Sequence, residues 1–289
     1  MIETKPHILC LIHLFPREID DFENVARQLH INHQYNLCFD ISYKLVLNLN
    51  IEIFDWEKSK IPKEFFISKF NHLIDLLSST GHHVDSIISN SGVWGQVELR
   101  KELQLETRYD GFLLIDPDMI FPNHFLHYLG EVLKSSIDYR NCVISPKMYS
   151  FWDSSWDEVC TNSYSPSVDT NQLDPYIVHV PSSEITLKQT SFVKFAGGWC
   201  TFLGSEVMTS VPFPTGVRGY GLEDTFIGMY CNKVGIKQYV LDGISVQENR
   251  KFLNNSLYVN YVPMNIELLK QTNEQNKQKF TKVMNSWIK

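Results

Sequence analysis

Short apolar runs alternate along the chain with segments in which apolar residues recur every three or four positions. The apolar runs predict strands near 8–15, 37–47, 84–89, 111–115, 142–145, 192–202 and 238–246. The helical spacing predicts helices near 20–29, 61–79, 96–105, 123–135 and 225–234. Pro146 is expected to end the strand before it. This alternation indicates an α/β fold with a mostly parallel central sheet flanked by helices.

The pattern disappears between residues 150 and 183, which are rich in Ser, Asp, Pro, Asn and Trp. We expect a long irregular insertion there, and long loops in compact domains are often functional. The whole chain, 1–289, reads as one domain with two halves, about 1–146 and about 147–250, and an extension at 251–289. Residues 273–289 predict a terminal helix that packs on the body, with a membrane-surface helix as the alternative.

Composition narrows the class of protein. Hydrophobic residues make up 43% and charged residues 20%, a balance that can bury a sizeable core. The net charge of −7 argues against binding to a nucleic-acid backbone. Six scattered cysteines without a C-x-x-C pair suit buried free thiols in a reducing compartment. Because no segment reads as a signal peptide or a membrane span, we expect a cytoplasmic protein.

A pair of carboxylates, Asp116 and Asp118, follows the apolar run 111–115. Alternate strand residues face the same way, so both acids could project from the carboxyl end of the strand, where open α/β sheets bind ligands. Oxygen ligands there suit a divalent metal that carries a phosphorylated ligand. By chance alone, roughly one such spacing is expected in a chain this long. The acids could instead cap the next helix or solvate a turn.

Two other segments could contact a sugar. Gly197-Gly198-Trp199 allows close approach of the backbone to a ligand and offers a ring for stacking, although a strand bulge with a core Trp fits equally well. Trp152 and Trp156 lie in the insertion, each followed by an Asp. They could stack on a sugar or anchor the loop to the body.

An acidic pair, Glu223-Asp224, follows the glycine-aromatic-glycine segment 219–221 and opens the helix expected near 225–234. Acids in a first helical turn are favoured by the helix dipole, which gives a purely structural explanation. The glycine-rich approach also suggests that they face a pocket. One carboxylate there could act as a general base on an incoming hydroxyl.

Taken together, these motifs resemble those of GT-A-fold glycosyltransferases, similar to the family-2-like enzymes, over roughly residues 8–250. The resemblance implies a Rossmann-like, mostly parallel sheet with a nucleotide-binding half and a smaller acceptor-side part. It also implies a hexosyl- or pentosyltransferase that uses a divalent metal, Mn or Mg. The donor would be a nucleotide-sugar, with a UDP-sugar expected first, and the acceptor a glycan or another hydroxyl-bearing molecule.

The resemblance also implies roles for single residues. Asp116 would face the ribose or the metal side of the donor, and Asp118 would be the metal ligand that holds the diphosphate. Asp224 would deprotonate the acceptor hydroxyl, with Glu223 orienting the acceptor or the base. This layout is similar to that of inverting members, although two carboxylates could also mark a retaining enzyme.

Five further residues fall where such families bind the donor. Leu14, Phe15 and Arg17 follow the first strand, at the position of the nucleotide base. Arg100 and Lys101 precede the Asp-x-Asp strand, where family members keep a basic residue for the donor. A solvated helix face explains that basic pair equally well.

The third metal ligand departs from the family pattern. Many members have a His after the last core strand, whereas here that region offers Gln247 and Glu248. Both carry oxygen ligands that suit a hard cation. Histidines 13, 30, 33, 82 and 83 fit no ligand spacing, and we expect them to be packing or surface residues.

Three other functions compete with glycosyl transfer. A Mg-dependent phosphohydrolase also uses Asp-x-Asp, but normally on its first strand. A nucleotidyltransferase would usually carry a glycine-rich basic loop after the first strand, and the segment 14–17 has no glycine. A non-catalytic sugar-nucleotide-binding relative is the third. The acceptor, the linkage and the oligomeric state stay open at this stage.

Overall fold

A computed structural model describes residues 5–35, 38–90, 96–135, 137–150, 186–190, 200–217, 223–248 and 261–288. Its strands are β1 (His7–Leu14), β2 (Asp40–Asn48), β3 (Val84–Ser89), β4 (Gly111–Ile115), β5 (Met119–Ile120), β6 (Cys142–Ser150), β7 (Thr186–Thr190), β8 (Cys200–Gly204) and β9 (Lys237–Glu248). The helices are α1 (Ile19–His33), α2 (Lys63–Ser78), α3 (Gln96–Leu103), α4 (Phe125–Leu133), α6 (Ser205–Ser210), α7 (Glu223–Val234) and α9 (Ile266–Ile288), with 3-10 turns η1 (Pro16–Glu18) and η2 (Tyr139–Asn141).

The strands within the described residues form one sheet in the order β3-β2-β1-β4-β8-β6-β9-β5, and β7 pairs with β9. β3, β2, β1 and β4 are parallel neighbours. β8 runs antiparallel to both β4 and β6, so β6 and its parallel partner β9 share the direction of β1. Six of these nine strands therefore point the same way. The predicted mostly parallel sheet flanked by helices is confirmed.

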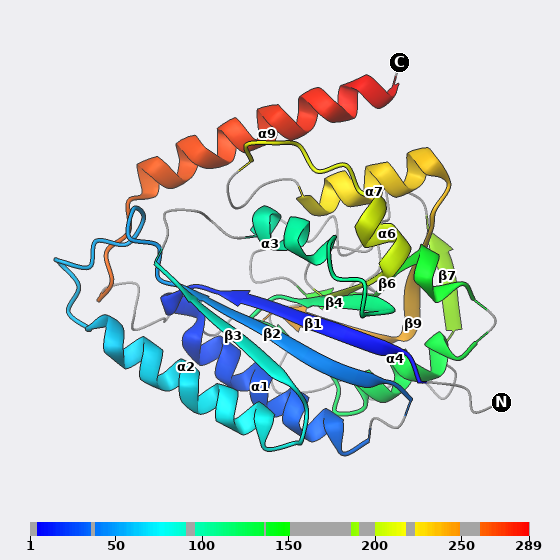
Figure 1. The fold of residues 1–289 in the computed structure, drawn as a ribbon, viewed down its shortest axis with the longest axis horizontal. Helices are drawn as coiled ribbons and strands as arrows, with labels where there is room; N and C mark the ends of the chain where they lie inside the picture. The colour runs from blue at the N-terminus through cyan, green and yellow to red at the C-terminus, as the bar shows by residue number, and fades with distance from the viewer. Residues whose placement is uncertain are drawn as a thin grey trace.

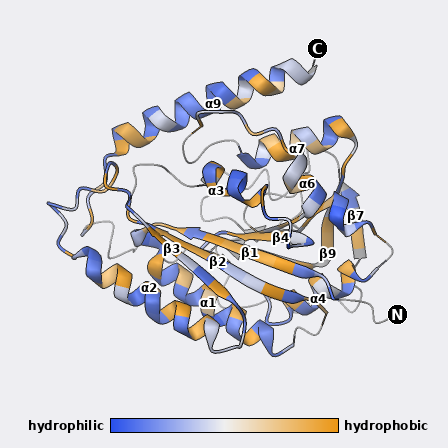
Figure 2. Cartoon of the chain, in the orientation of Figure 1, coloured by the Kyte–Doolittle hydropathy of each residue, from blue (hydrophilic) through white to orange (hydrophobic). Residues whose placement is uncertain are grey.

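Helices cover both faces of the sheet (Figure 1): α1, α2 and α4 lie on one side, and α3, α6, α7 and α9 on the other. The strand period of two explains this. Ile8, Cys10 and Ile12 of β1 join the core beneath α1 and α2, whereas Leu9 and Leu11 join the core beneath α3 and α7. Figure 2 shows the resulting apolar strands between helices whose outer faces are hydrophilic. Burial on both faces accounts for the continuous apolar runs seen in the sequence.

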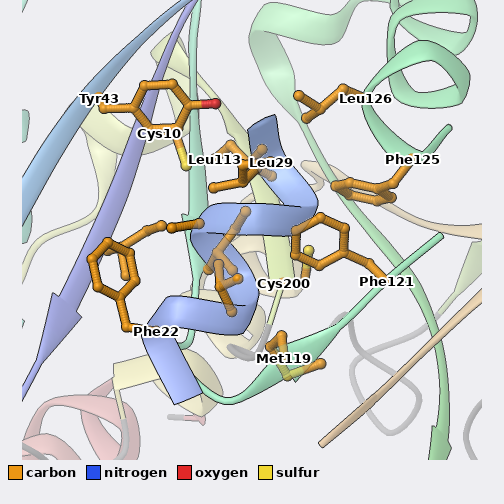
Figure 3. Close-up of a cluster of buried hydrophobic side chains, with 14 of the residues drawn as sticks. Cys10, Phe22, Leu29, Tyr43, Leu113, Met119, Phe121, Phe125, Leu126 and Cys200 are labelled. Atoms are coloured by element: carbon orange, nitrogen blue, oxygen red, sulfur yellow. The ribbon is translucent and has the colours of Figure 1, made fainter. Parts of the chain in front are cut away.

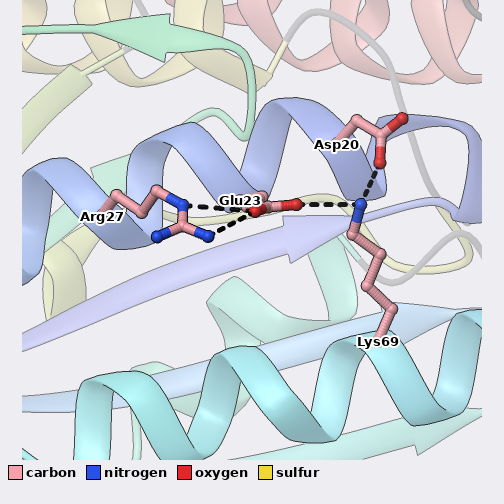
Figure 4. Close-up of polar contacts among 4 residues, drawn as sticks. All are labelled: Asp20, Glu23, Arg27 and Lys69. Carbon is pink, nitrogen blue, oxygen red and sulfur yellow. Dashed lines mark hydrogen bonds and ion pairs between the residues drawn. The ribbon is translucent and has the colours of Figure 1, made fainter.

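The core beneath α1 is rich in large rings (Figure 3). Phe22 and Leu29 of α1 share one buried cluster with Tyr43 and Leu113 of the sheet. On the outer side of the same helix layer, Lys69 of α2 lies 2.9 Å from Glu23 and also pairs with Asp20 (Figure 4). These ion pairs join α1 to α2, and partly exposed pairs of this kind contribute little stability. The contact of α1 with the sheet consists of buried apolar side chains.

Pro146 does not end the sixth strand, contrary to the prediction from the sequence. β6 continues to Ser150, and its pairing with β9 shifts register between Pro146 and Lys147. The antiparallel pairing of β6 with β8 covers only Val143 and Ile144. Proline is tolerated at such a bulge because no ladder hydrogen bond requires its missing N–H.

The C-terminal helix packs on the body of the protein. Phe280 and Met284 of α9 are buried against Phe226 of α7, which confirms the first of the two expectations for this segment. None of the helices in the described part of the chain is long and apolar enough to span a membrane. Five cysteines of the described residues are buried free thiols, as expected: Cys10, Cys38, Cys142, Cys200 and Cys231.

Candidate active site

The parallel strands β1, β2 and β4 end at the same edge of the sheet, at Leu14, Asn48 and Ile115. The register between β1 and β4 pairs Leu11 with Leu114. Two residues beyond this pair, the same register places Asp116 beside His13. The carboxylate motif therefore lies beside the end of β1, at the edge where open α/β sheets bind ligands.

Asp116 and Asp118 lie in a turn and not on a strand, unlike the geometry inferred from the sequence. β4 ends at Ile115, and the N–H of Met119 donates to the carbonyl of Asp116 at 3.4 Å across the buried Pro117. The proline fixes its own backbone and removes a donor, which favours a turn over a continued strand. The acids do not cap the following helix, because α4 begins at Phe125.

Glu18 is a third carboxylate at this edge, and the sequence analysis did not identify it. It closes the turn after β1, where its Oε2 accepts the N–H of Phe15 at 2.7 Å. Burial raises the pKa of Glu18 to about 8, with a smaller contribution from the charge of Asp118 and in opposition to the hydrogen bond from Phe15. Burial also raises the pKa of Asp118, to about 6. Two neighbouring acids that resist ionisation are what a cation would relieve, so these residues fit a divalent metal.

The backbone of Gln247 and Glu248 reaches the same turn. β9 pairs with β5 so that Glu248 lies opposite Met119 and Gln247 opposite Ile120. Met119 directly follows Asp118 in the chain. The strand pairing thus brings both candidates for the third metal ligand next to the carboxylate motif, across 129 residues of sequence between Met119 and Glu248.

A buried ion cluster forms on the α3 side of the sheet. Arg100 of α3 is 3% exposed; its Nη1 lies 3.5 Å from Glu223 Oε1, and its Nη2 donates to Asp224 Oδ1 at 3.0 Å. Arg100 therefore does not lie on a solvated helix face, which was one of the two sequence-based explanations. Breaking a buried ion pair leaves an uncompensated charge, so this cluster fixes the start of α7 against α3.

His13, at the end of β1, lies within the electrostatic reach of this cluster. Burial, together with the positive charge of Arg100, lowers its pKa to about 4. Its Nε2 is 3.5 Å from the side-chain amide of Asn48, and its ring packs edge-on against Phe15. As expected, His13 is a packing residue, but it occupies the site edge. Its position at the end of a predicted strand was the only sequence signal for this.

The remaining residues expected at the donor have varied environments. Leu14 is fully buried in the core, and Phe15 is half-buried against Phe54. Arg17 Nη2 donates to the carbonyl of Val262 at 2.5 Å. Lys101 Nζ donates to the carbonyl of Pro214 at 2.8 Å, away from the acids that hold Arg100. Residues 152, 156 and 197–199 (Trp152, Trp156, Gly197, Gly198 and Trp199), expected to bind the acceptor, lie outside the described residues.

Sequence comparison identifies no relative. The chain matches no protein-family model, and no curated protein is significantly similar to it.

Comparison with solved structures identifies the fold. One similar structure is a mannosyltransferase from Pyrobaculum calidifontis, solved in complex with GDP-Man and Mn2+, with a TM-score of 0.51 and 10% identity. Another is S. aureus TarS, with a TM-score of 0.50 and 10% identity. The matches cover 85% and 84% of this chain but only 57% and 36% of the matched chains, so this chain spans less than two thirds of each of those proteins. The chain has the GT-A, Rossmann-like fold that these glycosyltransferases share.

Proposed function

We propose that the protein is a glycosyltransferase that moves a sugar from a nucleotide-sugar to an acceptor hydroxyl, with metal assistance and inversion of configuration. The observation that carries the proposal is the ion cluster of Arg100, Glu223 and Asp224. It joins the helix that precedes the Asp-x-Asp strand to the acidic start of α7. Arg100 also lies close enough to His13, beside Asp116 in the β1–β4 register, to lower its pKa, which supports a single site that contains both acidic motifs. The GT-A mannosyltransferase with GDP-Man and Mn2+ supports the donor class.

The exposure of the two acids separates their roles. The Asp224 side chain is 34% exposed, whereas that of Glu223 is 3% exposed. An acceptor hydroxyl can therefore reach Asp224, while Glu223 serves to hold Arg100. Asp224 takes the hydroxyl proton as the acceptor oxygen bonds to the anomeric carbon, and the electron pair of the broken C–O bond leaves with the nucleotide. Arg100 orients Asp224 for this step.

Asp116 and Asp118 are proposed to hold the metal, with Glu248 or Gln247 supplying a further oxygen. Bound Mn²⁺ or Mg²⁺ would stabilise the negative charge of the departing nucleotide. The turn after β1 (Leu14, Phe15 and Arg17) is proposed to form one wall of the donor site. The Gly-Gly-Trp segment 197–199 and the two Trp of the insertion are proposed for the acceptor side.

Two substitutions test the proposal separately for binding and for chemistry. Asp118→Asn should abolish Mn-dependent binding of nucleoside diphosphates, measured by calorimetry. Asp224→Asn should keep that binding but slow transfer from UDP- or GDP-sugars by about 10²–10⁴-fold, the usual contribution of a general base. Asp75→Asn, an exposed acid on α2, is the control and should change neither.

Two outcomes would overturn the assignment. Normal transfer by Asp224→Asn would show that Asp224 is not the base. Hydrolysis of phosphate esters by the wild-type protein, without binding of any nucleotide-sugar, would replace the transferase by a phosphohydrolase.

A further inference from the structure

A second group of metal-ligating side chains lies far from the carboxylate motif. Cys38 Sγ, one ring nitrogen of His127 and one carboxylate oxygen of Glu131 lie within 4.8 Å of one another. Among the residues that the structure describes, no other three His, Cys, Asp or Glu side chains gather this closely. Cys38 precedes the start of β2, at the amino ends of the parallel strands. The group is therefore at the opposite sheet edge from Asp116 and Asp118, beside α4 (Figure 1).

Two elements bring these ligands together. His127 and Glu131 are one helical turn apart on α4 and share a face of that helix. Gly130 lets this face reach the chain before β2: a Cβ at position 130 would lie 2.3 Å from Cys38 Cβ and 3.2 Å from Cys38 Sγ. Any larger residue at 130 would move α4 away from Cys38. The small residue thus holds the thiol at ligand distance from His127 and Glu131.

A cation could replace the existing polar contacts of the group. Cys38 is 2% exposed, and its Sγ donates to Glu131 Oε1 at 2.8 Å. Lys134 Nζ supplies positive charge 3.4 Å from the same oxygen, from a side chain that is 51% exposed. His127 Nδ1 is buried and has no hydrogen-bond partner among the described residues. The half-exposed Lys134 side chain can move into solvent when a metal takes its place beside Glu131. A bound metal would also give the imidazole of His127 a partner.

The ligand set selects the kind of metal. A thiolate, an imidazole and a carboxylate are the groups that bind Zn²⁺, which takes three protein ligands and a water in open tetrahedral sites. Mn²⁺ and Mg²⁺ prefer oxygen ligands, so they suit the carboxylates Asp116 and Asp118 better than this group with its thiol. We propose that Cys38, His127 and Glu131 form a zinc site that joins α4 to the start of β2, independent of the transferase site.

Zinc binding at this site would release one proton. The Cys38 thiol proton is released to solvent as the Zn–S bond forms, and its hydrogen bond to Glu131 is replaced by the metal. Lys134 then loses its partner and turns to solvent. Zinc affinity should therefore rise with pH.

The test uses the full chain after chelator treatment, titrated with Zn²⁺ and, for spectroscopy, with Co²⁺. The wild-type protein should bind one Zn²⁺ at this site, and its Co²⁺ form should show a thiolate-to-metal absorption band. Cys38→Ser should remove the band. His127→Gln, at a half-exposed position that is compatible with folding, should weaken zinc binding by at least about tenfold, because even outer-shell partners of metal ligands contribute that much.

Matched controls separate this site from other ligands in the chain. Cys142→Ser removes another buried free thiol, and His124→Gln another histidine beside α4; neither should change the band or the affinity. Asp118→Asn should also leave zinc binding intact, which keeps the result distinct from the fate of the proposed function. Absence of the band in wild type, or its persistence in Cys38→Ser, would overturn the proposal, as would unchanged zinc affinity in His127→Gln.

Discussion

At the scale of single residues, the fold keeps the partly buried His33 neutral. Its Nε2 shares a 2.7 Å hydrogen bond with the hydroxyl of Tyr43, and the centre of its ring lies 3.9 Å from that of His82. Burial, together with the charges of His82 and His30, lowers the pKa of His33 to about 3. Protonation is therefore easier in the unfolded chain than in the folded one.

We expect His33→Gln to make stability less dependent on pH. Because the folded pKa is depressed, the contribution of His33 is full above the ordinary value of 6.5 and is lost as pH falls towards 3. At about pH 5 the wild type should have lost up to about 2 kcal/mol through this group, and His33→Gln should avoid that loss. Urea unfolding at about pH 7.5 and about pH 5 measures the difference. His72→Gln, an exposed histidine on α2, should behave as wild type; equal losses in all three proteins would refute the role of His33.

At the scale of elements, the backbone at the junction of β8 and α6 lies in close contact with the backbone of η2. Gly204 ends β8 and lies against the 3-10 turn η2: a Cβ there would lie 2.2 Å from the carbonyl oxygen of Arg140. The sequence did not predict α6 or η2, because segments this short have little periodicity of their own. Their positions depend on this backbone contact.

Gly204→Ala should force the two segments apart and destabilise the protein by about 1–3 kcal/mol, as overpacking does in well-packed cores. Chemical denaturation measures the change. Thr209→Ala, an exposed position on the same helix, serves as the control and should stay within about 0.5 kcal/mol of wild type. A Gly204→Ala protein as stable as the control would mean that η2 yields without cost.

At the scale of the whole molecule, the end of the chain supports the proposed active site. Phe226 of α7, three residues after Glu223, packs 5.0 Å from the ring of Phe280 and 4.8 Å from that of Trp287. Phe280 is fully buried. α7, whose first turn carries Glu223 and Asp224, is therefore packed against α9 through Phe226. Its first turn is also paired with Arg100 of α3.

Phe280→Ala should lower the free energy of unfolding by about 3–5 kcal/mol, the usual cost of such a core truncation. Urea denaturation followed by circular dichroism measures it. Phe65→Ala, at a phenylalanine that is 43% exposed on α2, should cost much less. A small effect of Phe280→Ala would mean that α9 does not stabilise the body.

The sequence by itself determined the local elements and the layer architecture. Runs such as 8–14 and 111–115 are buried on both faces, so their composition alone marks them as inner strands, and the spacing of apolar residues fixes α1, α2 and α7. It also singled out the acids Asp116, Asp118, Glu223 and Asp224 as candidate site residues, because short acidic motifs next to a predicted strand or helix can be recognised locally. The predicted end of β6 at Pro146 was wrong. Pro146 is tolerated because of how β6 pairs with β8 and β9, and this pairing cannot be seen in the sequence.

The tertiary structure alone decided which distant groups meet. Arg100 forms an ion pair with Asp224, 124 positions later in the sequence, and β5 pairs with β9 over a similar separation. Neither contact leaves a periodic signal in the sequence. Glu18 and His13 look ordinary in sequence, and their shifted pKa values arise only from burial and from charges brought close by folding. Strand order, ion pairing and shifted pKa values are long-range consequences of packing, whereas the periodicity and composition of helices and strands are local. The elements could therefore be predicted, and these pairings could not.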